Sequence, residues 1–238
     1  MLFFYIRHGD PIYTPDSLTE LGKKQANALA KRLSVYGIDK VYSSPSARAR
    51  QTAKPTCDWL KKEMIICEWA NESRAWEGFA IKNEKGTLEW CFQDDAMYST
   101  FHLPEVQNLG MNWHKHPAFS KYHFSSAIRN IDESVDDFLR ELGYQHDRIN
   151  KRYEMLEENG DRVALFAHQG FGLCFLSSML DIPYPIFSTH FDFGHSSITV
   201  INFEKHGQYA YPKVLQLSND SHLYKDDILT GYQNKIFF

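Results

Sequence analysis

The sequence begins with an apolar run that leads into arginine, histidine and glycine, LFFYIRHG at residues 2–9. A continuous apolar run of this kind is typical of a strand buried on both faces of a parallel sheet. A second segment, RVALFAHQG at residues 162–170, repeats the order of strand, histidine and glycine. Ligands bind beyond the carboxyl ends of the strands in such sheets. The two segments therefore predict an α/β fold with His8 and His168 at the ligand-binding edge of its sheet.

Strand and helix patterns alternate around these two segments. Residues 19–36 carry leucines and alanines near helical spacing, with Ser17 or Thr19 as the N-terminal cap and Gly37 as the stop. Further strands are expected at residues 40–43, 64–67, 197–203 and 213–217, and further helices at residues 46–62, 125–142, 146–159 and 171–180, with Pro55 disturbing the first of these. This order predicts a mostly parallel central sheet with helices on both faces.

The alternation stops at residues 79–125, a stretch rich in aromatic residues and histidines. The apolar rings expected to pack there are Trp90, Phe92, Tyr98, Phe101, Trp113, Phe119, Tyr122 and Phe124. So many rings are incompatible with a disordered linker. We therefore expect one domain over residues 1–238, with a partly helical, aromatic-rich insertion or lid at about 79–125.

Composition limits the classes of partner. Hydrophobic residues make up 43% of the chain and the net charge is -4, which gives no electrostatic reason to expect nucleic acid or an anionic membrane. The apolar run at the N-terminus is too short for a membrane span or a signal peptide. The four cysteines, Cys57, Cys67, Cys91 and Cys174, lie far apart without a C-x-x-C pair, which favours a reducing, cytoplasmic location. A small anionic substrate would be held by local arginines. The sequence makes no prediction of oligomeric state.

Three expected strand ends carry the chemistry. They present Arg7 and His8, then Ser44 followed by Arg48, and finally His168. An unprotonated imidazole can attack phosphorus. The planar donors of guanidinium groups match the geometry of the three equatorial oxygens of a phosphoryl group during its transfer. The leaving alkoxide also needs a proton, for which Glu72 and Glu77 are both candidates. No metal is expected, because the histidines His102, His114, His116 and His123 have no recognisable metal-ligand spacing.

Taken in order, these segments resemble the histidine phosphatase superfamily, which includes cofactor-dependent phosphoglycerate mutase. The similar segments are LTELGKKQA at residues 18–26, SSPSARARQTA at 43–53, ANE at 70–72 and ALFAHQG at 164–170, together with RHG at 7–9. The resemblance implies a phosphoglycerate mutase-like fold. We expect no cofactor for this chain. It implies that His8 accepts the phosphoryl group, that Arg7, Arg48 and His168 bind phosphate, and that Glu72 donates the proton. The family's usual Leu-x-Glu is Ala-Asn-Glu here, so Glu77 remains the alternative acid.

The sequence thus predicts a metal-independent phosphatase that hydrolyses a small phosphomonoester through phosphohistidine. One alternative is a mutase, which needs a second phosphate site. Residues 79–125 offer no arginine for it, only Lys82, Lys85, Lys115 and Lys121. The other alternative is a non-catalytic protein that binds or senses a phospho-ligand on the same fold.

Overall fold

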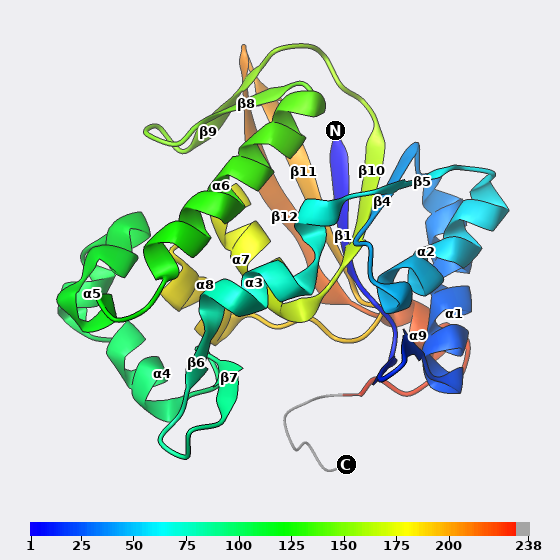
Figure 1. Cartoon of the computed structure of the whole chain (residues 1–238). Coiled ribbons are helices and arrows are strands. Elements are labelled where there is room, and N and C mark those ends of the chain that lie inside the picture. Colours follow the sequence, from blue (N-terminus) through cyan, green and yellow to red (C-terminus); the bar gives the residue numbers. More distant parts are fainter. Residues whose placement is uncertain (232–238) are drawn as a thin grey trace.

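The computed structural model describes residues 1–231, whose centre is one eight-stranded sheet (Figure 1). In sheet order, the strands are β5 (Met64–Ile66), β4 (Lys40–Ser43), β10 (Arg162–Ala167), β1 (Leu2–Arg7), β11 (Ile198–His206), β12 (Tyr209–Asn219), β9 (Arg152–Met155) and β8 (Tyr144–Asp147). The four strands from β5 to β1 are parallel, and the remaining pairings are antiparallel. The predicted α/β fold is confirmed, and its parallel half contains both histidine-bearing strands.

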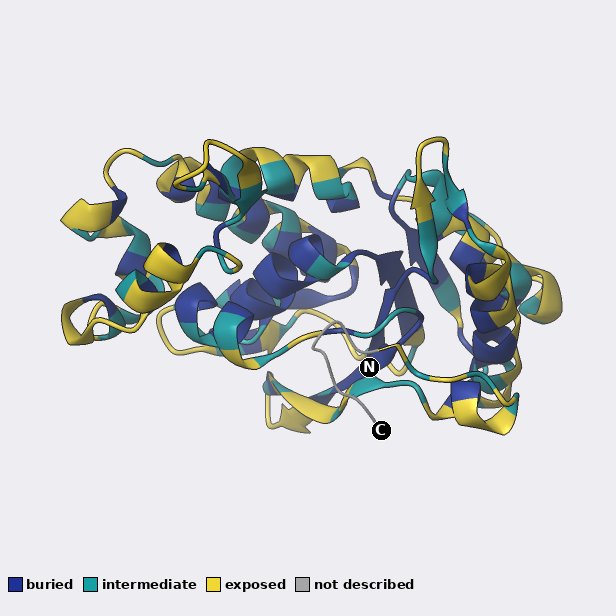
Figure 2. Cartoon of the chain, turned by 90° about the horizontal axis from the view of Figure 1, so that it is seen from below, coloured by how far each residue is buried: buried dark blue, intermediate teal, exposed yellow. Residues whose placement is uncertain are grey.

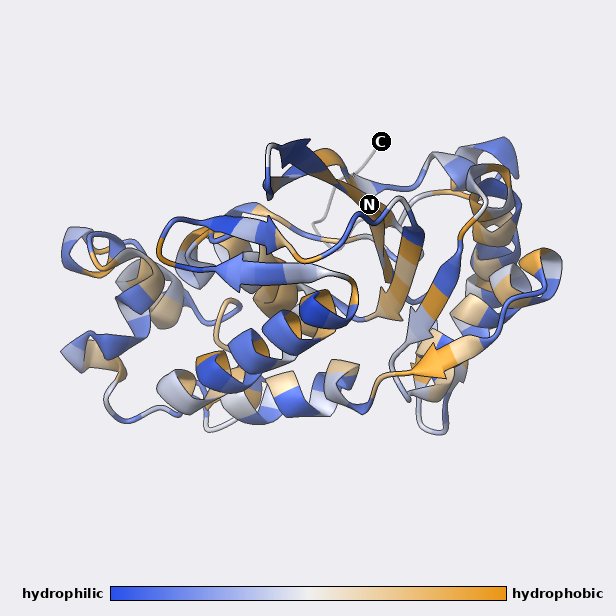
Figure 3. Ribbon diagram, turned by 90° about the horizontal axis from the view of Figure 1, so that it is seen from above, coloured by the Kyte–Doolittle hydropathy of each residue, from blue (hydrophilic) through white to orange (hydrophobic). Residues whose placement is uncertain are grey.

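Alternate residues of β1 enter opposite layers of the core. Phe3 and Tyr5 belong to one buried cluster, whereas Phe4 and Ile6 belong to another. The first cluster is shared with α6 (Phe124–Glu141) and α7 (Gln169–Met179), and the second with α1 (Glu20–Tyr36) and α2 (Ala47–Leu60). Buried residues gather on the central strands and on α7 (Figure 2), and hydrophobic residues gather on the strands (Figure 3). Helices therefore cover both faces of the sheet, as predicted.

The N-terminal helix begins and ends where its sequence signals indicate. The Thr19 side chain accepts a hydrogen bond from the amide of Gly22, and Gly37 has a φ of 72°. Glycine occupies this left-handed conformation without the steric penalty that a Cβ atom brings. By contrast, Pro55 lies inside α2 and the helix continues through it.

The prediction of a helix at residues 146–159 is wrong, because this stretch forms the β8–β9 hairpin. Tyr144 and His146 are buried while Gln145 and Asp147 are only partly buried, which is the period-two pattern of a strand. Gly143 has a φ of 89° and separates the hairpin from α6. Pairing of β9 with β12 then extends the sheet, a long-range contact that the local helical pattern did not reveal.

Residues 80–123 combine a short hairpin with small helices. They contain β6 (Ala80–Lys82), β7 (Leu88–Trp90), α4 (Asp95–Phe101), α5 (Pro104–Gln107) and two 3-10 turns (Figure 1). The buried ring of Trp113 lies 5.1 Å from Phe119 and stacks at 5.8 Å on Tyr184 of α8 (Tyr184–His190). Aromatic packing thus anchors this segment to the main body. Within residues 1–231, no helix has the length and apolar character needed to cross a membrane.

A buried ion cluster ties the β8–β9 hairpin to α6 and to the end of α7. The two ring nitrogens of His146 lie 3.0 Å from carboxylate oxygens of Asp136 and Asp181. Arg148 binds Asp136 at 2.8 Å and also donates to Ser178 at 3.1 Å. Burial alone would lower the pKa of His146, but the hydrogen bonds to Asp136 and Asp181 outweigh it and raise the pKa. The imidazolium form of His146 is therefore a structural cation.

This cluster predicts a pH-dependent contribution to stability. A raised pKa in the folded state adds stability that is complete below the unfolded pKa of about 6.5 and is lost as the pH rises through the folded value. His146→Gln should lower the free energy of unfolding by about 2 kcal/mol at pH 6 and by less at pH 9. Urea unfolding followed by circular dichroism measures both. An equal loss at the two pH values contradicts the prediction, and His206→Gln, at an exposed position, is the control.

Candidate active site

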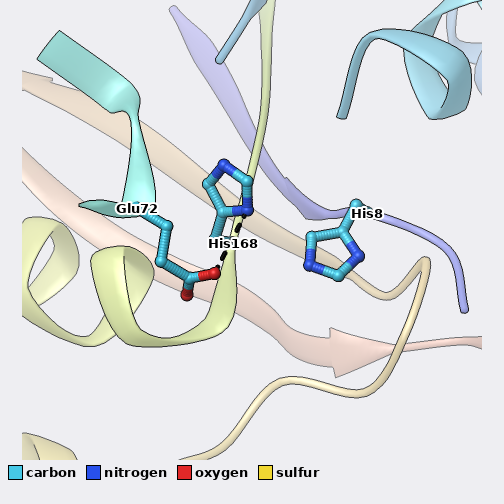
Figure 4. Close-up of side chains that lie close together, drawn as sticks. All are labelled: His8, Glu72 and His168. Carbon is cyan, nitrogen blue, oxygen red and sulfur yellow. Dashed lines mark ion pairs between the residues drawn. The ribbon is translucent and has the colours of Figure 1, made fainter. Parts of the chain in front are cut away.

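Four elements bring the five predicted site residues together. Arg7 and His8 lie at the end of β1, Arg48 is in the first turn of α2, and His168 lies between β10 and α7. Glu72 is the first residue of α3 (Glu72–Phe79), whose N-terminal cap is Asn71. Figure 4 shows His8, Glu72 and His168 converging from these separate elements. All except His168 line a common pocket of about 420 Å³.

His8 is buried and held in one orientation. Its Nδ1 lies 2.7 Å from the Gly9 carbonyl oxygen, so Nδ1 carries the ring proton and donates it. Its Nε2 accepts a hydrogen bond from Nε of Arg48 at 3.2 Å. Burial, followed by the charges of His168 and Arg7, lowers the pKa of His8 well below 6.5. At neutral pH, His8 therefore presents an unprotonated Nε2 to the pocket.

His168 lies beside His8, with ring centroids 5.2 Å apart. Its Nε2 is 2.7 Å from the Ser44 hydroxyl, and its Nδ1 is 3.1 Å from Nη2 of Arg48. The dashed line in Figure 4 marks the 3.5 Å approach of Nδ1 to Oε2 of Glu72, which would be an ion pair only with a protonated His168. Burial, followed by the charge of Arg48, lowers the pKa of His168 well below 6.5. Both imidazoles of the site are thus neutral in the absence of an anion.

The guanidinium of Arg48 lies at the centre of the site. Besides both histidines, it contacts Oε2 of Glu72 at 2.9 Å and Oδ1 of Asp16 at 3.0 Å. Within residues 1–231, the one set of side chains with the spacing of metal ligands is His8, Glu72 and His168. The ligand atoms of this set are the ones that Arg48 contacts. A metal ion would have to displace this cation, so the geometry favours an anion that Arg48 can bind.

The two candidate acids lie in different surroundings. Oε1 of Glu72 accepts a hydrogen bond from the backbone amide of Gly170 at 3.1 Å, and its side chain is 18% exposed. Glu77 is exposed and lines a separate groove with Arg74 and Glu133. Glu77 follows Glu72 by five positions in the helix, which directs the two side chains to different faces of α3. Of the two, Glu72 reaches the pocket that contains His8.

Two functional candidates were missed from the sequence. His195 accepts a hydrogen bond at Nε2 from Arg7 at 2.9 Å, and its ring centroid is 5.7 Å from that of His8. Burial, followed by the charge of Arg7, lowers the pKa of His195 to about 4. Asp16 holds Arg48 and also accepts from the amide of Ala47 at 2.7 Å. A glycine-flanked histidine just before strand β11 was the available signal for His195, whereas Asp16 resembles an ordinary turn residue.

Three helix N-termini point to the same place. Arg48 is in the first turn of α2, Glu72 begins α3, and His168 is the N-terminal cap residue of α7. The macrodipole of each helix places partial positive charge at its N-terminus, and anions are stabilised there. Together with Arg7 and Arg48, these helix ends supply the pocket with donors for an anion although the whole chain carries a net charge of -4. The arrangement suits a small phosphate group.

Comparisons with known proteins agree with this chemistry. The family model of the histidine phosphatase superfamily (branch 1) matches residues 4–108. A protein from Hydrogenobacter thermophilus, named as a phosphoserine phosphatase, is 24% identical over 129 residues, which are 54% of this chain. The matched region covers 56% of that relative, so the chain spans about half the length of the curated protein it matches.

Solved structures show that the fold is shared over nearly the whole chain. A phosphoserine phosphatase mutant from Entamoeba histolytica, in complex with phosphoserine, is similar with a TM-score of 0.57 and 19% identity, covering 93% of this chain and 98% of that one. A mycobacterial glucosyl-3-phosphoglycerate phosphatase, in complex with VO3, is similar with a TM-score of 0.56 and 16% identity, covering 90% and 97%. At these identities the similarity establishes the fold and leaves the chemistry to the residues of the site.

The buried histidines predict a characteristic titration. At pH 6.5, His8 and His168 should be neutral, because burial lowers both pKa values, whereas His146 should still carry two ring protons. Nitrogen NMR of the imidazole rings distinguishes these states, with His8→Ala and His168→Ala variants used for assignment. A doubly protonated His8 at pH 6.5 would contradict the electrostatic picture of the site.

Proposed function

We propose that the chain is a member of the histidine phosphatase superfamily, whose family model matches residues 4–108, and that it hydrolyses a phosphomonoester through a phosphohistidine intermediate on His8. The observation that carries the proposal is the buried, neutral imidazole of His8. Its unprotonated Nε2 accepts a hydrogen bond from the Arg48 guanidinium. The phosphatases among the similar proteins support a small phosphorylated metabolite as the substrate class.

In the proposed complex, the phosphoryl group replaces the contact between Arg48 and His8. Guanidinium forks of Arg48 and Arg7 then bind its equatorial oxygens. The Nε of Arg7 is buried and has no hydrogen-bond partner among the described residues, so a donor is available for an incoming anion. His168 adds a third donor in the tautomer that carries its proton on Nδ1. In that tautomer Nε2 accepts a hydrogen bond from the Ser44 hydroxyl, which lies 2.7 Å away.

Nucleophilic attack then starts from Nε2 of His8. Its lone pair forms the N–P bond while the P–O bond to the leaving alcohol breaks and the electron pair goes to that oxygen. The hydrogen bond from Nδ1 to the Gly9 carbonyl oxygen keeps the ring in position and stabilises the positive charge that develops on the imidazole.

Glu72 is placed to protonate the leaving oxygen. In the ligand-free site its carboxylate pairs with Arg48 at 2.9 Å. A phosphate group that binds Arg48 would replace this pairing and leave the carboxyl group of Glu72 free to deliver its proton to the leaving oxygen. After the alcohol leaves, the carboxylate can take a proton from water as that water attacks the phosphohistidine, which releases phosphate and restores His8.

Hydrolysis fits the pocket better than a mutase reaction does. A mutase must retain a ligand with two phosphate groups, which calls for a second set of cations. Among the described residues that line the pocket, the cationic side chains are Arg7 and Arg48, and both serve the first phosphate. The lysines of residues 79–125 do not line it. We therefore favour water as the phosphoryl acceptor.

The first prediction concerns the covalent intermediate. Wild-type protein mixed with a ³²P-labelled phosphomonoester and quenched in alkaline detergent should retain a labelled phosphoryl group that acid removes, as expected of a phosphoramidate. His8→Ala should abolish both this label and phosphate release. A protein that binds the ester but neither labels nor releases phosphate would be a binding module, and label that survives acid would contradict the chemistry.

The second prediction assigns the acid. Glu72→Gln should lower kcat/KM for an alkyl phosphate at least about 100-fold, because the alkoxide leaves without a proton. For nitrophenyl phosphate, whose leaving oxygen hardly needs one, the loss in kcat/KM should be less than about tenfold. Glu77→Gln is the matched control and should leave both values near wild type. A larger loss in Glu77→Gln than in Glu72→Gln would reverse the assignment.

A further inference from the structure

The outer part of the candidate pocket is aromatic and uncharged. Beyond the residues that face the phosphate, it is lined by the rings Tyr13, Trp76 and Trp90 and by the neutral polar side chains Asn71, Ser73 and Gln169. We propose that the leaving alcohol of the substrate is uncharged and carries a flat apolar group, as in an aryl or arylalkyl phosphate. This inference rests on the proposed phosphatase function and specifies its substrate class.

The two tryptophans form a rigid wall. Trp76 of α3 and Trp90 of β7 meet edge to face, with centroids 5.0 Å apart and an interplanar angle of 85°. Phe92 stacks on Trp90 at 5.7 Å. Because a Cβ atom on Gly170 would lie 2.3 Å from Cζ2 of Trp90, the absence of a side chain there lets the indole reach the first turn of α7. Trp90 is thereby fixed close to His168, and residues 80–123 contribute a wall of the site.

Tyr13 supplies a third ring from another direction. It lies in the β2 strand (Pro11–Tyr13), which pairs with β3 (Asp16–Leu18), and its ring is 5.4 Å from the guanidinium carbon of Arg48. Tyr13 as a whole is 66% exposed, so it is accessible to a ligand. A planar group between Tyr13 and the tryptophans would be removed from water and would contact aromatic surface. The pocket volume of about 420 Å³ lies within the range typical of small-molecule sites.

Charge argues against a second anionic group on the substrate. Both cations that line the pocket within the described residues are assigned to the phosphate, which leaves neither for a second anion. Arg48 also pairs with Asp16 and Glu72, and Arg7 also binds His195 and the Phe193 carbonyl. A carboxylate on the leaving alcohol would instead meet the negative faces of aromatic rings and the carboxyl group of Glu72. No further cation lines the pocket within the described residues to offset the cost of its desolvation. The pocket therefore disfavours esters of hydroxy acids.

Turnover of three alkyl phosphates tests the proposal, because their leaving oxygens have similar intrinsic reactivity. We expect kcat/KM for 2-phenylethyl phosphate to exceed that for butyl phosphate about tenfold, and that for 3-phosphoglycerate to be lowest by a further factor of about ten. In Trp76→Leu, the ratio of phenylethyl to butyl ester should fall to about three or less. Because a general loss of structure would lower all three rates together, it cannot produce this fall in the ratio.

Trp59→Leu is the matched control, because Trp59 is 56% exposed on α2 and does not line the pocket, so its ester ratios should equal those of wild type. Preference for 3-phosphoglycerate over the phenylethyl ester, or a ratio that Trp76→Leu leaves unchanged, would overturn the inference while leaving the phosphatase function intact.

A binding measurement separates this inference from catalysis. Calorimetric titration with 2-phenylethylphosphonate and 2-carboxyethylphosphonate, neither of which can be hydrolysed as an ester, should give at least about tenfold tighter binding of the phenylethyl compound. If no ester is turned over, the proposed function fails and these two affinities alone decide the pocket's preference. Equal affinities, tighter binding of the carboxylate, or no binding of either compound would overturn the inference.

Discussion

The contacts of the Arg48 guanidinium organise the whole site. One planar cation touches Nε2 of His8, Nδ1 of His168, Oε2 of Glu72 and Oδ1 of Asp16. These groups come from different elements, and a guanidinium offers its donors in a fixed plane. The position of each group therefore depends on the others. An anion that binds Arg48 would change the surroundings of the nucleophile and of the candidate acid at the same time, which links substrate binding to proton transfer.

Burial is the main reason why the two histidines beside Arg48 are neutral. Helix α7 is buried over almost its whole length, and together with β1 it encloses His8 and His168. Removal from water disfavours the charged form of both imidazoles, and the neighbouring arginines act in the same direction. The same low-dielectric setting strengthens the attraction between the helix N-termini and a bound phosphate. The core that stabilises the sheet thus also keeps the nucleophile unprotonated.

Local patterns account for the parts of the fold that the sequence predicted. The apolar strands β1 and β10, and the caps Thr19 and Gly37 of α1, are encoded by neighbouring residues. The hairpin at residues 144–155 was mistaken for a helix because its stability comes from contacts between distant segments. His146 is held by Asp136 of α6 and by Asp181 beyond α7, and β9 pairs with β12. No window of adjacent residues contains that information.

The sequence by itself determined the strands β1, β4, β5 and β10 of the parallel half of the sheet, and it placed His8, Arg48 and His168 where strands end or helices begin. Strand direction alone brings such positions to one edge of a sheet. Only the tertiary structure decided which carboxylate reaches the pocket, Glu72 instead of Glu77, and only it revealed His195 behind Arg7 and the aromatic wall of Trp76 and Trp90. These features depend on side-chain directions and on pairs of residues far apart in the chain, which periodicity and spacing do not specify.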